Sequence, residues 1–240
     1  SRGEIMVIIA AWADGKITAK NNIRDCAKLA SKACKEANIS LQEIDVVIYS
    51  GVYRPNFRSE PSCASHIQSK LDIRCHDLEL SSEHCFSFDI IDGSRGVHRS
   101  IQTVSHLIEQ LEVKNALIVC ADVKPSKQSK WPYQNHALAM VLSGNDTGLK
   151  FVSSEYKGGK LSAYTKSSFD TKKKVSVITY FGDSSNVEEI KAEREFTSDS
   201  SSLGSVQMRD FLLWSQNKKG NLKHTIVDRA GSISVTNWKV

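Results

Sequence analysis

Hydrophobic and polar positions in the first 150 residues alternate between strand-like and helix-like patterns. Four short, nearly continuous apolar runs predict buried strands: 5–11, 45–51, 116–121 and 137–143. Apolar residues at helical spacing predict helices at 22–37, at 62–71 with Ser62 as the cap, and from about Ser94 to Leu111. Strands that alternate with helices favour an α/β fold with a mostly parallel sheet.

The pattern changes after about residue 150, where strands become more frequent. Runs at 151–156, 161–165 and 175–180 predict strands, 203–216 predicts a helix, and 224–227 and 232–238 predict two closing strands. Residues 197–202 are polar and predict a loop. We therefore divide the chain into 1–150 and 151–240, and no internal repeat is evident in the sequence.

The segment from Cys85 to Val97 predicts a strand, a tight turn of small residues and the start of a helix. Ser94 falls at the first helical turn, where unpaired N–H groups and the positive end of the dipole favour an anionic ligand. Many α/β folds place a nucleophile or a phosphate-binding group here. Serine is also a preferred capping residue, so Ser94 is interpreted either as a structural residue or as a nucleophile.

His98 lies four residues after Ser94 and shares its helix face, so it is a candidate base for the Ser94 hydroxyl. The alternative is a buried histidine whose hydrogen bonds are satisfied. The remaining histidines and the cysteines do not have metal-ligand spacing, so we predict neither a metal nor a cofactor.

Composition narrows the class of protein. The longest apolar run, residues 5–13, is far shorter than the ~20 residues that span a bilayer, and it lacks the features of a signal peptide. Six cysteines are scattered without CxxC pairing, which favours reduced thiols and a cytoplasmic protein. A net charge of +5 is too small to indicate nucleic acid, although it is compatible with an acidic protein partner.

Four stretches resemble the ketosynthase III (β-ketoacyl-acyl-carrier-protein synthase III) branch of the thiolase superfamily. They are 33–47, the helix 60–71, the turn 88–96 (family pattern "FDI.aaCsGf") and the strand 114–122. The resemblance implies a thiolase-like layered α/β/α fold with a near-complete N-terminal half and a reduced C-terminal half. Residues 231–240 resemble the last strand pair of the family, so we expect the chain to reach the family's C-terminus.

The sequence departs from the family pattern where the family has its chemistry. Ser94 stands at the position of the catalytic cysteine, and Arg95 stands where a small residue borders the acyl pocket. The family's "HQAN" and "HGNtsaaS" motifs and its CoA-binding "WI..R.GI" segment are absent, and His224 is the one histidine in 151–240. Because a serine hydroxyl needs an adjacent base, these changes argue against the family's own mechanism.

The resemblance leads to three hypotheses. The favoured one is a degenerate subunit that pairs with a catalytic ketosynthase homologue in acyl condensation for fatty-acid, polyketide or other secondary-metabolite biosynthesis. It would pair through the edge of the strand from Cys85 to Ile90, as in the small subunit of heterodimeric alkylquinolone-forming ketosynthases, with an acyl carrier protein as a further partner. The alternative is an acyltransferase with Ser94 as nucleophile and His98 or another histidine as base. The third is a homodimer that binds an acyl chain without turnover. None of them requires nucleic acid or a membrane.

Overall fold

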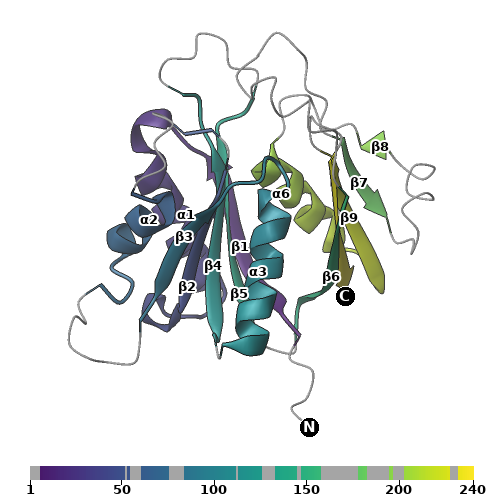
Figure 1. The fold of residues 1–240 in the computed structure, drawn as a ribbon, viewed down its shortest axis with the longest axis horizontal. Coiled ribbons are helices and arrows are strands. Elements are labelled where there is room, and N and C mark those ends of the chain that lie inside the picture. The colour runs from purple at the N-terminus through teal and green to yellow at the C-terminus, as the bar shows by residue number, and fades with distance from the viewer. Residues whose placement is uncertain are drawn as a thin grey trace.

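The fold comes from a computed structural model (Figure 1). It describes 6–51, 53–54, 61–75, 84–111, 113–125, 133–144, 147–157, 203–227 and 232–240, and the backbone of 178–182 and 195–196. The strands are β1 (Ile8–Lys16), β2 (Val46–Ser50), β3 (Phe86–Ile90), β4 (Asn115–Asp122), β5 (His136–Ser143), β6 (Leu149–Lys157), β7 (Ile178–Gly182), β8 (Glu195–Phe196), β9 (Asn221–Val227) and β10 (Ile233–Lys239). The helices are α1 (Asn22–Glu36), α2 (Cys63–Leu71), α3 (Gly96–Gln110) and α6 (Gly204–Ser215), with 3-10 turns at Ala19–Asn21 and Leu41–Glu43.

Local sequence chemistry sets the helix ends as predicted. The Ser62 hydroxyl accepts a hydrogen bond from the Ser65 N–H and caps α2, which confirms the predicted cap. The predicted helices 22–37 and 203–216 are confirmed as α1 and α6, and the predicted helix from about Ser94 begins two residues later, at Gly96. No described helix is long and apolar enough to cross a membrane.

Some strand predictions shift, and others fall outside the described residues. β1 begins and ends later than the predicted 5–11, because its pairing with β5 runs from Ile8 to Lys16. The predicted strand 161–165 and loop 197–202 lie outside the described residues, as does the first part of 175–180, whose remainder overlaps β7.

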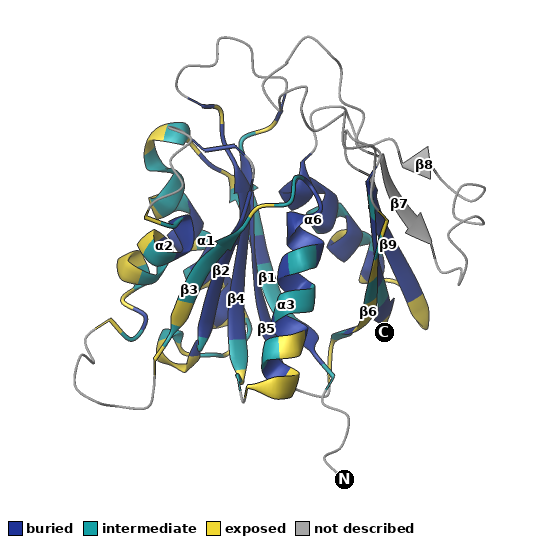
Figure 2. Cartoon of the chain, viewed as in Figure 1, coloured by how far each residue is buried: buried dark blue, intermediate teal, exposed yellow. Residues whose placement is uncertain are grey.

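The strands form one mixed sheet in the order β3-β2-β4-β5-β1-β6-β10-β9-β7-β8. The prediction of a mostly parallel sheet is wrong. Among the described strands, the pairs β2–β3 and β2–β4 are parallel, and every other pair is antiparallel. β4 and β5 are antiparallel although both are buried along their whole length (Figure 2). Their nearly continuous apolar sequences arise because helices pack on both faces of the sheet. Such packing occurs for parallel and antiparallel strands alike.

The described helices form two layers against the sheet (Figure 1). α1 and α2 cover the outer face of the first five strands, with Cys26, Ala30 and Ile67 in the core beneath them. α3 and α6 lie between the two halves of the sheet, in a second core that reaches Trp238 on β10. The layered α/β class is therefore confirmed.

Both halves of the sheet have the same strand order. Reading outward from the centre gives β1-β5-β4-β2-β3 on one side and β6-β10-β9-β7-β8 on the other, so each half places its own first, fifth, fourth, second and third strands in that sequence. α3 and α6 each precede the fourth strand of their half. The halves differ in direction, because β2 is parallel to β4 whereas β7 is antiparallel to β9. The chain thus contains an internal repeat of topology.

Candidate functional site

The turn between β3 and α3 is held together by Asp92. Its carboxylate accepts hydrogen bonds from Arg95 Nη2 at 2.6 Å and from Arg99 Nε at 3.2 Å. Gly93 has a φ of +56°, a left-handed conformation that favours glycine. Gly96, the first residue of α3, packs against Ser50 at the end of β2, where a β-carbon would collide with the hydroxyl. The turn is therefore rigid, and its acidic group is occupied by two guanidinium groups.

Ser94 is buried at the meeting point of α3 and α6. It lies two residues before α3, and Arg95 is the residue that precedes the helix, so the Ser94 hydroxyl makes no capping hydrogen bond. A β-carbon on Gly204, the first residue of α6, would lie 2.7 Å from the Ser94 carbonyl oxygen. Ser94 therefore does not cap α3, and its role as a nucleophile stays a prediction.

His98 faces the second half of the sheet and is fully buried. Its Nδ1 lies 2.8 Å from Ser234 Oγ, and its Nε2 lies 2.9 Å from His224 Nδ1 and 3.2 Å from Thr236 Oγ1. These contacts match the interpretation of His98 as a satisfied buried histidine. Its role as a base for Ser94 stays a prediction, and these partners on β9 and β10 do not favour it.

Burial keeps both histidines of this pair neutral. It lowers the pKa of His98 to about 3, with a smaller effect in the same direction from the Arg95 charge. The pKa of His224 is also lowered well below its usual value, first by burial and then by His98. The His224 ring stacks on Phe211 of α6, with 4.7 Å between centroids. The two histidines therefore join α3, α6 and the second half of the sheet.

A third buried histidine, His136, was not singled out from the sequence. Its Nε2 lies 3.0 Å from Asp14 Oδ2 on β1, and its Nδ1 lies 3.1 Å from Ser205 Oγ on α6. These residue types also occur in catalytic triads. Here the serine is only 1% exposed, whereas the carboxylate is the more accessible end. The arrangement therefore ties α6 to the first half of the sheet and offers no accessible nucleophile.

Known proteins resemble this chain in part of the sequence and in the overall fold. No family model matches it. A β-ketoacyl-[acyl-carrier-protein] synthase III of Clostridium perfringens strain SM101 is 32% identical over 154 residues, which is 60% of this chain and 44% of that enzyme. The corresponding protein of strain ATCC 13124 is 31% identical over 154 residues, with the same shares of each chain. Over these 154 residues the chain is similar in sequence to the ketosynthases III.

Solved structures of thiolase-fold enzymes agree with this relationship. OleA from Xanthomonas campestris bound with cerulenin has a TM-score of 0.66 at 13% identity, covering 98% of this chain and 97% of that chain. The 3-oxoacyl-[acyl-carrier-protein] synthase III from Aquifex aeolicus VF5 has a TM-score of 0.64 at 11% identity, covering 98% of this chain and 100% of that chain. At these identities the likeness shows the thiolase fold. The chain spans less than half the length of the curated ketosynthases III that it matches.

Burial makes the thiols of Cys63 and Cys85 weaker acids than an exposed cysteine. Burial raises the pKa of Cys63 to about 11 and that of Cys85 to about 12, so both stay protonated at neutral pH. All six cysteines are free. In the part of the chain that the structure describes, no group of three or more His, Cys, Asp or Glu residues could hold a metal ion.

The strand before the turn, β3, forms one edge of the sheet. It pairs with β2 on one side, and no described strand covers the other. Phe86 at its start is 67% exposed, and Ile91 just after its end is 55% exposed. Asp89 anchors the strand from the inside, where its carboxylate accepts hydrogen bonds from the N–H groups of Cys63 and Ala64 on α2. β3 is therefore a firmly held strand with an open edge and an apolar residue at each end.

Proposed function

We propose that this chain is a ketosynthase III-like subunit that pairs with a catalytic ketosynthase homologue in acyl condensation, in fatty-acid, polyketide or other secondary-metabolite biosynthesis. An acyl carrier protein is the partner class that we expect to deliver the substrate. The six free thiols suit a reducing compartment such as the cytoplasm.

One observation carries the proposal, namely the arrangement of side chains around the turn before α3. Ser94 stands at the position of the family's cysteine, and a serine hydroxyl requires a base to become nucleophilic. The nearest histidine along the chain, His98, is hydrogen-bonded to His224, Ser234 and Thr236. Asp92, which could orient a base, is engaged by Arg95 and Arg99. The sequence contains neither "HQAN" nor "HGN".

The open edge of β3 supports pairing. An edge strand presents unpaired N–H and C=O groups that a strand of another chain can extend, and natural monomers usually protect such edges. Here the edge is flanked by two exposed apolar side chains, Phe86 and Ile91, and is stiffened by the buried ion pair of Asp89 with Arg54. The surface therefore has both the main-chain groups and the apolar contacts of an interface core.

We expect Phe86→Glu to weaken pairing at least tenfold, because a charge in the apolar core of the interface would be buried without a partner. Phe86 is a better target than Ser87, whose hydroxyl hydrogen-bonds Ser65 on α2. The partner is first isolated with a tagged chain from the native host, and the mass of the intact complex is determined. Leu111→Glu is the control, since Leu111 is 66% exposed at the end of α3. Equal binding by both variants would place the interface elsewhere.

We expect Ser94→Ala to leave the turnover of the assembled complex unchanged, because the proposal gives the Ser94 hydroxyl no chemical role. The measurement compares product formation by wild-type and variant complexes of equal, verified stoichiometry. A loss of turnover of a hundredfold or more without loss of assembly would instead support the serine-nucleophile acyltransferase.

A further inference from the structure

The strand β1 has an open edge at the opposite side of the first half of the sheet. It pairs with β5 over its whole length, but with β6 only through Ile8 and Ile9. From Ala10 to Lys16, no described strand lies on the other side of β1. Alternate residues of an antiparallel strand direct their N–H and C=O groups away from their partner. This stretch therefore offers a row of main-chain donors and acceptors.

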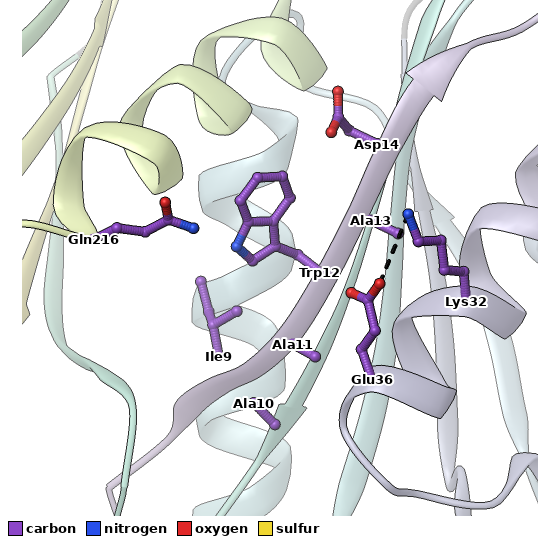
Figure 3. A pocket seen from close by; sticks show the side chains of 9 residues that line it. All are labelled: Ile9, Ala10, Ala11, Trp12, Ala13, Asp14, Lys32, Glu36 and Gln216. Atoms are coloured by element: carbon purple, nitrogen blue, oxygen red, sulfur yellow. Dashed lines mark ion pairs between the residues drawn. The ribbon is translucent and has the colours of Figure 1, made fainter.

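A groove runs along this edge between α1 and α6 (Figure 3). It has a volume of about 440 Å³, and its lining on β1 includes the small side chains of Ala10, Ala11 and Ala13 and the indole of Trp12, which points toward α6. Lys32 and Glu36 of α1 form one wall, and Gln216 after α6 stands on the other side. The groove thus lies where an added strand would extend the sheet between two helical layers.

The charges on the α1 wall are arranged so that they complement a copy of themselves. Lys32 and Glu36 form an ion pair of 3.7 Å one helical turn apart, and both side chains are exposed. When two copies of α1 run antiparallel, Lys32 of each faces Glu36 of the other. A two-fold axis perpendicular to the sheet produces this arrangement and also makes two copies of β1 antiparallel.

The two-fold axis that brings Lys32 opposite Glu36 also passes near the middle of the open stretch of β1. Gly15 on β1 lies beside Leu29 on α1. The midpoint between Lys32 and Glu36 lies five residues beyond Leu29, which is about 7.5 Å along the axis of α1. A strand covers the same distance in about two residues. Because α1 runs toward lower-numbered residues of β1, that midpoint is level with about Ala13, the centre of the stretch from Ala10 to Lys16.

We propose that a second copy of this chain docks at this groove, with β1 pairing antiparallel to β1 about a two-fold axis near Ala13 and Lys32 facing Glu36 of the second copy. This interface is separate from the edge of β3. An assembly that used both edges would hold two copies of this chain and two of the ketosynthase partner.

The test uses Phe86→Glu as the background, because this substitution disables the β3 edge. Light scattering after size exclusion should give twice the 26.6 kDa mass of one chain. Adding Lys32→Glu should raise the dissociation constant of this dimer at least tenfold, since two attractive contacts become repulsive. Adding Glu36→Lys to that variant should restore the dimer, because the swapped charges complement each other again. Lys28→Glu is the control, as Lys28 is exposed on α1 but does not line the groove.

A Phe86→Glu chain that is monomeric would overturn the proposal, as would a dimer that Lys32→Glu leaves intact. Failure of Glu36→Lys to restore the dimer would also overturn it, since a different occupant of the groove has no reason to respond to the swap. The proposed pairing through β3 is tested separately by binding of the ketosynthase partner, so the two can fail independently.

Discussion

Replacing Asp89 by alanine should lower the free energy of unfolding by about 3–5 kcal/mol, the cost of removing one partner from a buried ion pair. Asp89 Oδ2 lies 2.8 Å from Arg54 Nη2, and the two side chains are 8% and 5% exposed. The same carboxylate accepts hydrogen bonds of 2.9 Å from two N–H groups in the first turn of α2. The variant therefore leaves a guanidinium group buried without its carboxylate and removes an acceptor at the helix start.

The measurement is the urea unfolding midpoint of wild type and variant at pH 7. Asp89→Asn should cost less than alanine, because the amide oxygen can still accept one of the N–H groups. Glu155→Ala is the matched control, since Glu155 is an exposed carboxylate on β6 and its removal should change the stability by less than about 0.5 kcal/mol. If Asp89→Ala cost no more than this control, Asp89 would not anchor β3.

Local features of the fold were predictable because their causes lie within a few residues. The Ser62 cap of α2 depends on a hydrogen bond three residues along the chain. The start of α3 depends on Gly93, which takes the left-handed conformation, and on Gly96, which packs against β2. Small residues in this order, after an apolar strand, leave few alternatives to a strand–turn–helix.

The direction of the strands could not be predicted from the same pattern. The strands β4 and β5 are apolar between their polar first and last residues because helices cover both faces of the sheet, and this holds for either strand direction. The internal repeat was hidden for a similar reason. It is a repeat of strand order, which different sequences can produce as long as each places apolar residues toward the same core.

The surroundings of His98 show why the candidate site was only partly predictable. Helical spacing predicted that His98 shares a face with Ser94, but α3 begins after Ser94, and the partners of His98 lie on β9 and β10. His224 is 126 residues away along the chain, so no local pattern connects the two. The one hint in the sequence was that His224 opens the predicted strand 224–227, which follows the predicted helix 203–216; the strand itself, β9, begins earlier, at Asn221.

The two neutral histidines should make the protein lose stability as the pH falls. The pKa of His98 is about 3 in the folded protein, against about 6.5 in an unfolded chain, and that of His224 is lowered in the same direction. Between these values the unfolded state binds more protons than the folded state, so acidification favours unfolding. Full stability is present above about pH 6.5, and His98 should remove about 2 kcal/mol between pH 7 and pH 5, with a further loss in the same direction from His224.

Urea unfolding at pH 7, 6 and 5 measures this dependence, in a range where most carboxylates remain ionised. His98→Gln should reduce the slope of stability against pH by about 1.4 kcal/mol per unit, because the group that excludes the proton is gone. Leu111→Gln should leave the slope unchanged, since Leu111 is exposed and the substitution removes no titratable group. An unchanged slope in His98→Gln would mean that the pair can take up a proton without leaving the core. The contact between α3 and β9 would then have to adapt to a charge, which makes that contact the first place to look for movement between the two halves.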